Sequence, residues 1–494
     1  MSVQSPPITP IFERELFIDN EWRPGSTGET LELVDPATER PFGRVSLAGE
    51  ADIDAAVSAA RAAFDDGPWP AMTVKERAAA LVRLADELEK DIEPLTEVLI
   101  KETGQVVGAS QGNVGAMAGM LRYNAGLADS FVAVEMRKGV TGPTAQIEKR
   151  PLGVVAAIIP FNAPLGLAAF KLPPALLMGC TVVMKPSDYT PVSAGYLADA
   201  ALRAGLPAGV LNIVPAGPEQ SSRLVGHPGV DAVTFTGSTV VGRAIAEAAA
   251  PTLKRVTLEL GGKSPALVLD DAPLERIVET LVPAITNNNG EVCTVPSRLI
   301  VPRSRKDEIV SALAAAFARV KVGPPSDPGS TVGPMVNKRH YDRVLRLLAT
   351  VEPEGGQFAF GGGPVAGLDT GYYLEPTIIT DVSSGATVAQ EEIFGPVVVV
   401  LTYEDEAEGI ELANDTEFGL SGAVFSADED RALRVAREIR SGTVNINNGI
   451  TIDISVPFGG VKQSGYGREL GPEGLEPFYE TRVVFIDGEP LITL

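Results

Sequence analysis

The chain has 494 residues, 45% of them hydrophobic, and carries a formal net charge of -23 at pH 7. At roughly 150 residues per domain, this length predicts about three domains with well-filled apolar cores. The excess of acidic residues argues against nucleic acid or an anionic membrane as a partner, because both are bound through a basic face.

Cysteine and histidine are rare, with two residues of each. Cys180 lies in the continuous apolar run Leu176–Met184, which predicts a buried, inert thiol. Neither a CxxC pair nor a Cys/His cluster occurs, so we expect neither a disulfide framework nor a metal site. The first residues lack the pattern of a signal peptide, and no apolar run approaches the roughly eighteen residues that span a bilayer. We therefore expect a cytoplasmic protein.

Helical and strand patterns alternate along the chain. Periodicity predicts an amphipathic helix over Asp52–Phe64, a long helical segment over Lys75–Val107 and a further helix over Val192–Arg203. Short apolar runs predict strands at Val154–Ile159, Thr181–Lys185, Val210–Val214, Ala232–Phe235 and Ser264–Val268. Because apolar strands that alternate with helices are typical of a parallel sheet covered on both faces, the pattern predicts an α/β fold.

A candidate phosphate-binding turn lies at Gly237 and Ser238. It joins the predicted strand Val233–Thr236 to a helical segment that runs to Ile245. The free backbone amides and the positive end of the dipole at such a helix start attract pyrophosphate. A serine at this place is also an ordinary helix cap, and the chain has no GxGxxG fingerprint. The turn by itself leaves phosphate binding open.

Cys293 lies in a polar setting, since it follows the segment Asn287–Val292 and precedes Thr294. A rare thiol in a glycine- and asparagine-rich turn predicts a nucleophile, because a reactive cysteine needs exposure and donors that stabilise its thiolate. No GxSxG motif is present, which argues against a serine hydrolase.

Seven short motifs follow one another in the chain. They are Pro160-Phe161-Asn162-Ala163-Pro164, Lys185-Pro186-Ser187-Asp188, Phe235-Thr236-Gly237-Ser238, Leu258-Glu259-Leu260-Gly261-Gly262-Lys263, Cys293, Glu391-Glu392-Ile393-Phe394-Gly395-Pro396 and Pro457-Phe458-Gly459-Gly460. In this order they resemble the NAD(P)-dependent aldehyde dehydrogenase superfamily. The resemblance covers nearly the whole chain, and several ordered motifs are more specific than any one of them.

The resemblance implies an aldehyde dehydrogenase-like α/β fold of three parts. These are a Rossmann-like NAD-binding domain of residues 1–126 and 148–258, a catalytic α/β domain of residues 259–477, and a small β oligomerisation arm of residues 127–147 and 478–494. The strand character of Phe478–Ile486 would allow pairing at a subunit edge. A homodimer or a homotetramer is therefore expected, and the sequence leaves the two open.

The resemblance also implies oxidation of an aldehyde to the carboxylic acid. The Cys293 thiolate would attack the carbonyl, and the oxyanion of the thiohemiacetal would be held by the Asn162 amide and the backbone N–H of Cys293. Hydride transfer would leave a thioester on the cysteine. Glu259 matches the general base that would activate water to hydrolyse it.

The cofactor positions implied by the resemblance are Lys185 and Asp188 on the adenosine ribose, Gly237 and Ser238 at the pyrophosphate, and Glu392 and Phe394 at the nicotinamide end. Gly242 is expected to be a further cofactor-binding residue. The family usually has Trp where this chain has Phe161, and Glu where it has Asp188. A carboxylate at position 188 would accept ribose hydroxyls and repel a 2′-phosphate. NAD is thus expected, with NADP as the alternative.

Five residues match positions that line the family's substrate tunnel: Ala163, Phe170, Val292, Thr294 and Phe458. Because these side chains are small or apolar, we expect an uncharged aromatic or medium aliphatic aldehyde. Two other activities stay open. One is an acylating dehydrogenase that passes the thioester to coenzyme A and would need no base such as Glu259, and the other is a catalytically silent NAD-binding scaffold.

Overall fold

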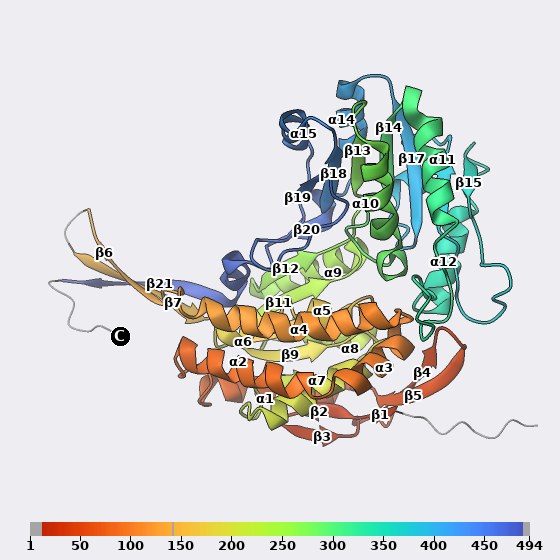
Figure 1. Ribbon diagram of the computed structural model, residues 1–494. Helices are drawn as coiled ribbons and strands as arrows, with labels where there is room; N and C mark the ends of the chain where they lie inside the picture. Colours follow the sequence, from red (N-terminus) through yellow and green to blue (C-terminus); the bar gives the residue numbers. More distant parts are fainter. Residues whose placement is uncertain (1–11, 141–142, 488–494) are drawn as a thin grey trace, which may run out of the picture.

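The computed structural model describes residues 12–140 and 143–487. Two α/β lobes lie one above the other, and a slender arm projects from the lower lobe (Figure 1). The outer ends of the predicted cofactor domain and arm, residues 1–11 and 488–494, and residues 141–142 within the arm lie outside the described residues. Among the helices of the described ranges, none is long and apolar enough to cross a membrane.

The lower lobe is built on an eight-stranded sheet that is parallel through its centre. Its order is β20 (Gly465–Tyr466), β12 (Arg255–Glu259), β11 (Ala232–Thr236), β8 (Val154–Ile158), β9 (Thr181–Lys185), β10 (Leu211–Ile213), β2 (Leu16–Ile18) and β3 (Glu21–Arg23). The outer strands β20, β2 and β3 pair antiparallel to their neighbours. The strands predicted between residues 154 and 235 are confirmed, with ends that shift by one residue.

Helices cover both faces of this sheet, which explains why its central strands are buried along their whole length. On β8, Val155 and Ala157 pack into one core cluster, whereas Val154, Ala156 and Ile158 pack into another on the opposite face. The helices of this lobe are α1 (Glu50–Asp65), α2 (Val74–Glu89), α3 (Ile92–Thr103), α4 (Val107–Leu127), α5 (Pro164–Ala168), α6 (Leu172–Leu177), α7 (Val192–Arg203), α8 (Pro218–Gly226) and α9 (Thr239–Ala249). The helices predicted over Asp52–Phe64 and Val192–Arg203 are confirmed as α1 and α7.

The long helical segment predicted over Lys75–Val107 is wrong in its continuity. The chain forms α2 and α3 there, and α4 begins at Val107. Pro94 lies in the first turn of α3, where its missing N–H costs nothing, whereas inside a continuous helix it would break the hydrogen-bond ladder. Gly104 ends α3 in the left-handed conformation with φ of 72°, which glycine adopts without strain.

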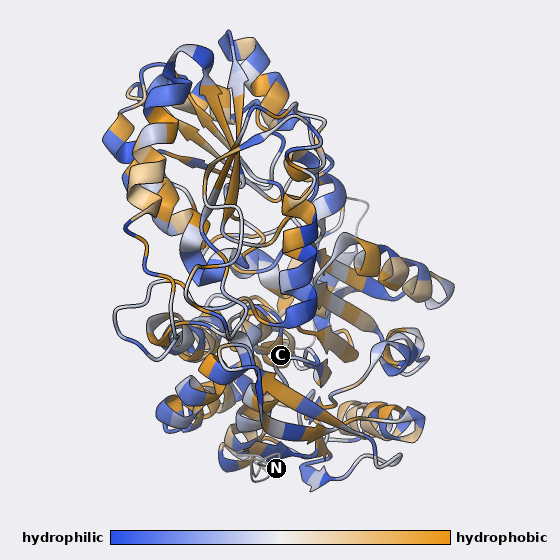
Figure 2. Cartoon of the chain, turned by 90° about the vertical axis from the view of Figure 1, so that its right-hand side faces the viewer, coloured by the Kyte–Doolittle hydropathy of each residue, from blue (hydrophilic) through white to orange (hydrophobic). Residues whose placement is uncertain are grey.

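The upper lobe is built on a seven-stranded sheet that is parallel except at one edge. Its order is β15 (Gln357–Phe360), β16 (Thr377–Thr380), β17 (Val397–Tyr403), β14 (Arg298–Pro302), β13 (Pro265–Val268), β18 (Ser421–Phe425) and β19 (Thr443–Ile446). The helices of this lobe are α10 (Leu274–Thr286), α11 (Lys306–Phe317), α12 (Lys338–Leu348), α13 (Thr387–Gln390), α14 (Glu406–Asn414) and α15 (Glu429–Ala436). In Figure 2 the strands are orange and lie between helices that carry blue residues, as expected of a sheet buried on both faces.

The arm is a three-stranded antiparallel sheet in the order β21 (Tyr479–Ile486), β7 (Thr144–Pro151) and β6 (Val134–Lys138). All of β21 pairs with β7, so the end of the chain joins a hairpin that lies more than 300 residues earlier. The strand predicted over Phe478–Ile486 is therefore confirmed, beginning at Tyr479. Phe485 on β21 is 69% exposed. A separate small sheet at the other side of the lobe contains β1 (Phe12–Arg14), β5 (Arg40–Ser46) and β4 (Thr30–Asp35).

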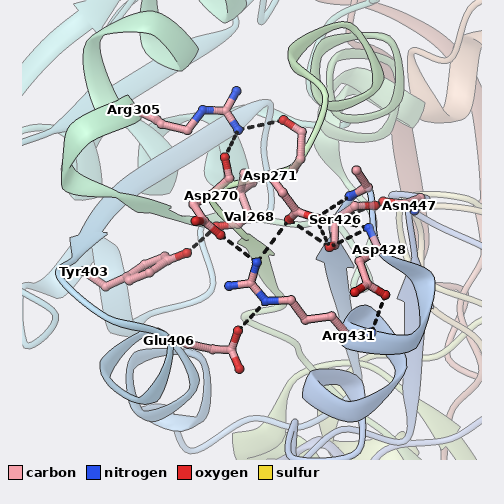
Figure 3. Close-up of polar contacts among 12 residues, drawn as sticks. Val268, Asp270, Asp271, Arg305, Tyr403, Glu406, Ser426, Asp428, Arg431 and Asn447 are labelled. Atoms are coloured by element: carbon pink, nitrogen blue, oxygen red, sulfur yellow. Dashed lines mark hydrogen bonds and ion pairs between the residues drawn. The ribbon is translucent and has the colours of Figure 1, made fainter.

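A polar network ties the carboxyl ends of β13 and β18 to α15 (Figure 3). The Asp271 carboxylate accepts hydrogen bonds from the Ser426 hydroxyl at 2.8 Å and from the Asp428 N–H at 3.1 Å. Arg431 from α15 contacts Asp270 at 2.7 Å. Although burial alone would raise the pKa of Asp271, the bonds from Ser426 and Asp428 and the charge of Arg431 lower it. The charged groups of this network are paired with one another. The network lies at the carboxyl ends of the upper strands, whereas Cys293 lies at the amino end of β14.

The motif residues lie at the carboxyl ends of the lower sheet and at the amino ends of the upper sheet. The carboxyl ends of β8, β11 and β12 in the lower lobe lead into the motifs around Asn162, Gly237 and Glu259. Cys293 precedes β14, and Glu392 precedes β17, at the amino ends of the upper sheet. Ligands of open α/β sheets bind outside the carboxyl ends of the strands. The motifs found in the sequence therefore meet between the lobes.

Candidate active site

A cavity of about 230 Å³ lies between the lobes and is open to the Cys293 side chain. Its lining residues are Pro160, Phe161, Asn162, Leu167, Thr236, Gly237, Ser238, Leu260, Gly261, Cys293, His340, Arg343, Glu392 and Phe394. Cys293 follows the short turn Asn287–Gly290, in which Asn288 and Asn289 take left-handed φ angles of 49° and 59°. This tight turn presents the thiol to the cavity from the upper lobe.

The thiol is less exposed than its polar sequence neighbours suggested. Burial raises the pKa of Cys293 above its ordinary value, and the negative charges of Glu392 and Glu259 raise it further. This direction does not favour ready ionisation in the free protein, and the nucleophilic part of Cys293 stays a prediction. The turn lies between the lobes, which leaves the side chain partly buried, and two carboxyl groups lie near the sulfur.

Asn162 presents an amide that is already oriented. Its Nδ2 donates a hydrogen bond to the backbone carbonyl of Glu291 at 2.8 Å. Its own backbone carbonyl accepts a bond from Asn288 Nδ2 at 2.7 Å. An amide nitrogen carries two hydrogens. One of them fixes the side chain against the segment that leads to Cys293, and the other is available to a ligand in the cavity.

Glu259 is the last residue of β12, and it does not line the cavity around the thiol. Its side chain is buried, and neither carboxylate oxygen has a hydrogen-bond partner among the described residues. Burial, followed by the charge of Glu469, raises the pKa of Glu259 well above its ordinary value, against the opposite effect of Lys171. Lys171 and Glu469 form a buried ion pair behind it. A raised pKa is what a base that works near neutral pH requires.

A second cavity, of about 520 Å³, adjoins the first and shares Pro160, Phe161, Thr236, Gly237 and Ser238 with it. Lys185 and Asp188 lie on its wall, and Lys185 Nζ contacts Asp188 Oδ1 at 2.7 Å. Ser238 is the N-cap of α9, so the positive end of that helix points toward the cavity.

The second cavity fits a dinucleotide in two respects. The buried hydroxyl of Thr236, on the wall of both cavities, has no hydrogen-bond partner within the described part of the chain, and so offers a group to a polar ligand. The helix start at Ser238 suits a pyrophosphate. Gly242 does not line either cavity. A Cβ there would lie 2.5 Å from Leu260, so the glycine allows α9 to pack closely on the strand connection.

The loop Glu392–Phe394 forms part of the wall of the first cavity. Gly262 N donates to Glu392 Oε1 at 3.0 Å. Burial raises the pKa of the Glu392 carboxyl. A Cβ at Gly261 would lie 2.6 Å from that carboxylate, so only glycine permits this approach. Phe394 has a left-handed φ of 60°.

Two residues of α12 that the motifs did not indicate also line the first cavity. His340 Nε2 lies 2.7 Å from the Phe394 carbonyl, and Arg343 donates to the carbonyls of Glu392 at 2.7 Å and Ile393 at 3.0 Å. The rings of Phe161, His340 and Phe394 pack against one another with centroids 5.6 to 5.9 Å apart. Phe161, where the family usually has Trp, thus belongs to an aromatic wall.

The family model for the Aldehyde dehydrogenase family matches residues 22–484. The chain belongs to this family. It is similar to geranial dehydrogenase of Castellaniella defragrans, with 42% identity over 97% of this chain and 100% of the relative. Among solved structures it resembles an aldehyde dehydrogenase of Mycobacterium tuberculosis in complex with NAD⁺, with a TM-score of 0.93, 42% identity, and coverage of 96% of this chain and 98% of that one. An aldehyde dehydrogenase of Burkholderia cenocepacia has a TM-score of 0.93 at 37% identity, with 97% of this chain and 99% of that one covered.

The protein is therefore an NAD-dependent aldehyde dehydrogenase, as the ordered motifs predicted. Its fold class is confirmed as well. The dehydrogenase brings Cys293, Asn162, Glu392 and Phe394 to one cavity, and Lys185, Asp188, Gly237 and Ser238 to the adjoining one.

The five residues expected to line a substrate tunnel are not on the wall of the thiol cavity of the dehydrogenase. Phe170 and Phe458 pack edge to face with ring centroids 6.1 Å apart, in the core cluster that Cys293 also contacts. Thr294 is buried, and Val292 packs on the core of the upper lobe. Ala163 precedes α5. Leu167, which the sequence did not single out, lines the cavity instead.

The residues that sequence reasoning missed share one property. Lys171 and Glu469 are 298 positions apart, and His340 and Phe394 are 54 apart, so each partnership exists only after the lobes have folded. Glu469 follows Arg468 in an ordinary charged stretch, and His340 lies on an amphipathic helix. The isolated His340 in a chain with two histidines was the one available signal.

Proposed function

We propose that Cys293 is the nucleophile, Asn162 the oxyanion donor and Glu259 the general base of this dehydrogenase. The observation that carries the proposal is the cavity that Cys293 and Asn162 share, whose wall also includes Glu392 and Phe394. The raised pKa of the buried Glu259 supports its part.

In the proposed reaction the Cys293 thiolate attacks the aldehyde carbon and forms a thiohemiacetal. The free hydrogen of the Asn162 amide and the backbone N–H of Cys293 stabilise the oxygen anion, and each such donor contributes about 2.7 to 4 kcal/mol to the transition state. NAD held beside them would supply a positive ring charge that favours the thiolate and would accept the hydride whose loss from the thiohemiacetal leaves a thioester on Cys293. Glu259 then takes a proton from water, which attacks the thioester and releases the acid.

We propose that Lys185 and Asp188 bind the adenosine ribose and that Gly237 and Ser238 bind the pyrophosphate, with Gly242 as a packing residue beneath them. Lys185 and Asp188 are paired with each other at 2.7 Å. This pairing leaves the Lys185 charge engaged and keeps a carboxylate where a 2′-phosphate would lie, which favours NAD over NADP. Glu392 and Phe394 would contact the nicotinamide half.

For the substrate we propose an uncharged, medium-sized apolar aldehyde. The thiol cavity is lined by Phe161, Leu167, Leu260 and Phe394. Arg343, a cationic residue on that wall, is occupied by two backbone carbonyls. Geranial dehydrogenase, a similar protein, is named for an uncharged branched aldehyde, which agrees with an apolar site. Phe170 and Phe458 belong to the core cluster against which Cys293 packs, which supports a part for both in the approach to the cavity.

We further propose the division into a cofactor domain, a catalytic domain and an arm. The strands of the three main sheets support it, although β20, from the predicted catalytic segment, pairs with β12 in the lower sheet. The exposed Phe485 and the outer edge of β21 support a homo-oligomer, dimer or tetramer, formed through the arm. The free thiols of Cys180 and Cys293 support a cytoplasmic location.

The test is NADH formation by the purified protein from benzaldehyde, aliphatic aldehydes and a branched terpenoid aldehyde, without coenzyme A. We expect turnover with apolar aldehydes and little with charged ones. Cys293→Ala should abolish turnover and retain NAD binding. A requirement for coenzyme A would refute the hydrolytic role of Glu259, and normal turnover of Cys293→Ala would refute the nucleophile.

A further inference from the structure

Glu291 is a buried acid at the catalytic turn that the proposed reaction does not use. It lies two residues before Cys293 and is 2% exposed. Its Oε1 accepts a hydrogen bond from the Val336 N–H at 3.1 Å. Burial raises the pKa of Glu291 well above its ordinary value, so the group is held in its neutral form to higher pH than an exposed glutamate. Among the described residues no lysine or arginine pairs with Glu291, so its burial at this place calls for a structural explanation.

The bond to Val336 fixes the chain immediately before α12. Asn337 follows as the N-cap of that helix, and its Oδ1 accepts from the His340 N–H at 2.8 Å. The His340 ring lies against the same acid, with Nε2 at 3.6 Å from Glu291 Oε1. The side chain of Glu291 therefore determines where the first turn of α12 rests on the nucleophile turn.

The same turn of α12 holds the loop Glu392–Phe394. A carbonyl can only accept, so the 2.7 Å contact between His340 Nε2 and the Phe394 oxygen places the ring hydrogen on Nε2. Burial lowers the pKa of His340 to about 4, which keeps the ring neutral. With the two bonds from Arg343, α12 binds three consecutive carbonyls of the loop.

The loop needs this support because Phe394 adopts a left-handed backbone conformation with φ of 60°. Such a conformation is strained in a residue other than glycine and persists only where surrounding contacts enforce it. The Glu392 carboxylate has a single described hydrogen bond of its own, from Gly262 N. The position of the Glu392 side chain therefore depends on the main chain of the loop, which α12 holds.

We propose that Glu291 is a positioning residue that places α12 and, through His340 and Arg343, the cofactor loop Glu392–Phe394. The main-chain carbonyl of Glu291 also accepts the Asn162 amide at 2.8 Å. One residue thus sets both the oxyanion donor and the nicotinamide end of the site. The inference rests on the proposed function in one respect, namely that Glu392 and Phe394 contact the cofactor.

The experiment measures the dissociation constant of NAD for the full chain by calorimetry, without aldehyde. Glu291→Leu keeps the bulk and loses the acceptor, so it should weaken NAD binding at least tenfold. Glu291→Gln keeps a neutral acceptor for the Val336 N–H, so it should bind NAD within threefold of the wild type. His340→Ala should weaken binding severalfold, and His340→Gln, which can donate to Phe394, should restore part of the loss.

Asp52→Leu is the matched control. Asp52 is another buried carboxylate that accepts backbone N–H bonds, from Gly49 at 2.9 Å and Ser26 at 2.8 Å, and it lines neither cavity. This variant should lose thermal stability without a change in NAD affinity. If both leucine variants lose stability but neither loses NAD affinity, Glu291 is merely structural and the proposal is overturned.

Two further outcomes also test the proposal. If Glu291→Gln binds NAD as weakly as Glu291→Leu, the group acts through its proton or charge, which overturns positioning through an acceptor. If Glu291→Leu does not fold, the two His340 variants decide, and equal NAD affinity in both and the wild type overturns the proposal. Failure of the proposed function is seen separately, as wild-type protein that binds NAD but forms no NADH, or as unchanged binding in Glu392→Ala.

Discussion

Removal of the Asn162 amide is the most direct test of the site chemistry. In Asn162→Ala the cavity loses the hydrogen that faces the reacting oxygen, and the Glu291 carbonyl loses its 2.8 Å donor. Loss of one oxyanion donor costs about 2.7 to 4 kcal/mol, which corresponds to roughly 10² to 10³ in the rate of acylation. The lost buried hydrogen bond should lower the free energy of unfolding by only about 1 kcal/mol. Catalysis should therefore fall far more than stability.

The assay is single-turnover NADH formation in a stopped-flow instrument with saturating NAD and aldehyde. Asn162→Asp provides the sharper comparison, because it has the same shape but places an acceptor where the oxyanion forms, so its loss should be at least as large. Thermal melts and NAD titrations should show both variants folded and able to bind cofactor. If the folded Asn162→Ala acylates within about threefold of the wild type, the amide does not stabilise the oxyanion and the assigned role is wrong.

Three more predictions concern the carboxylates and the thiol. Glu259→Gln should slow steady-state turnover by roughly 10² to 10⁴ and produce a burst of NADH equal to the enzyme concentration, since deacylation alone loses its base, whereas turnover without a burst would contradict that role. The rate of alkylation of Cys293 by iodoacetamide without NAD should still rise with pH at pH 9, because burial and the charges of Glu392 and Glu259 raise the thiol pKa. NAD should accelerate the alkylation at pH 7.5. A rate that reaches a plateau below pH 8 in the free enzyme would contradict this reasoning. Asp271→Asn should lower the free energy of unfolding by about 1 to 2 kcal/mol at pH 7, through the lost charged hydrogen bonds in a partly exposed network. Because the folded pKa of Asp271 lies below its unfolded value, this stability is present above about pH 4 and is lost as the pH falls through the folded pKa, so urea titrations of the two proteins should converge in acid.

The α/β fold class could be predicted because apolar strands and helical periodicity are local properties of the sequence. The mostly apolar strands Thr181–Lys185 and Ala232–Thr236 are buried along their whole length, as in a sheet covered on both faces. The helix Val192–Arg203 was found with its correct ends. The prediction for Lys75–Val107 missed the breaks because apolar periodicity continues through Pro94 and Gly104. Periodicity alone does not mark a break between helices that pack on the same core.

By itself, the sequence determined the family, the α/β architecture and the identity of the groups that can do chemistry, since short motifs and periodicities are properties of neighbouring residues. Only the tertiary structure decided the state of those groups. The thiol of Cys293 is partly buried beside two carboxyl groups. Burial, and then a glutamate that comes 210 positions later, raises the pKa of Glu259. Residues of α12 hold the main chain of the loop Glu392–Phe394. Ionisation depends on burial and on charges within a few ångströms. Those neighbours come from distant parts of the chain, so no local pattern records them.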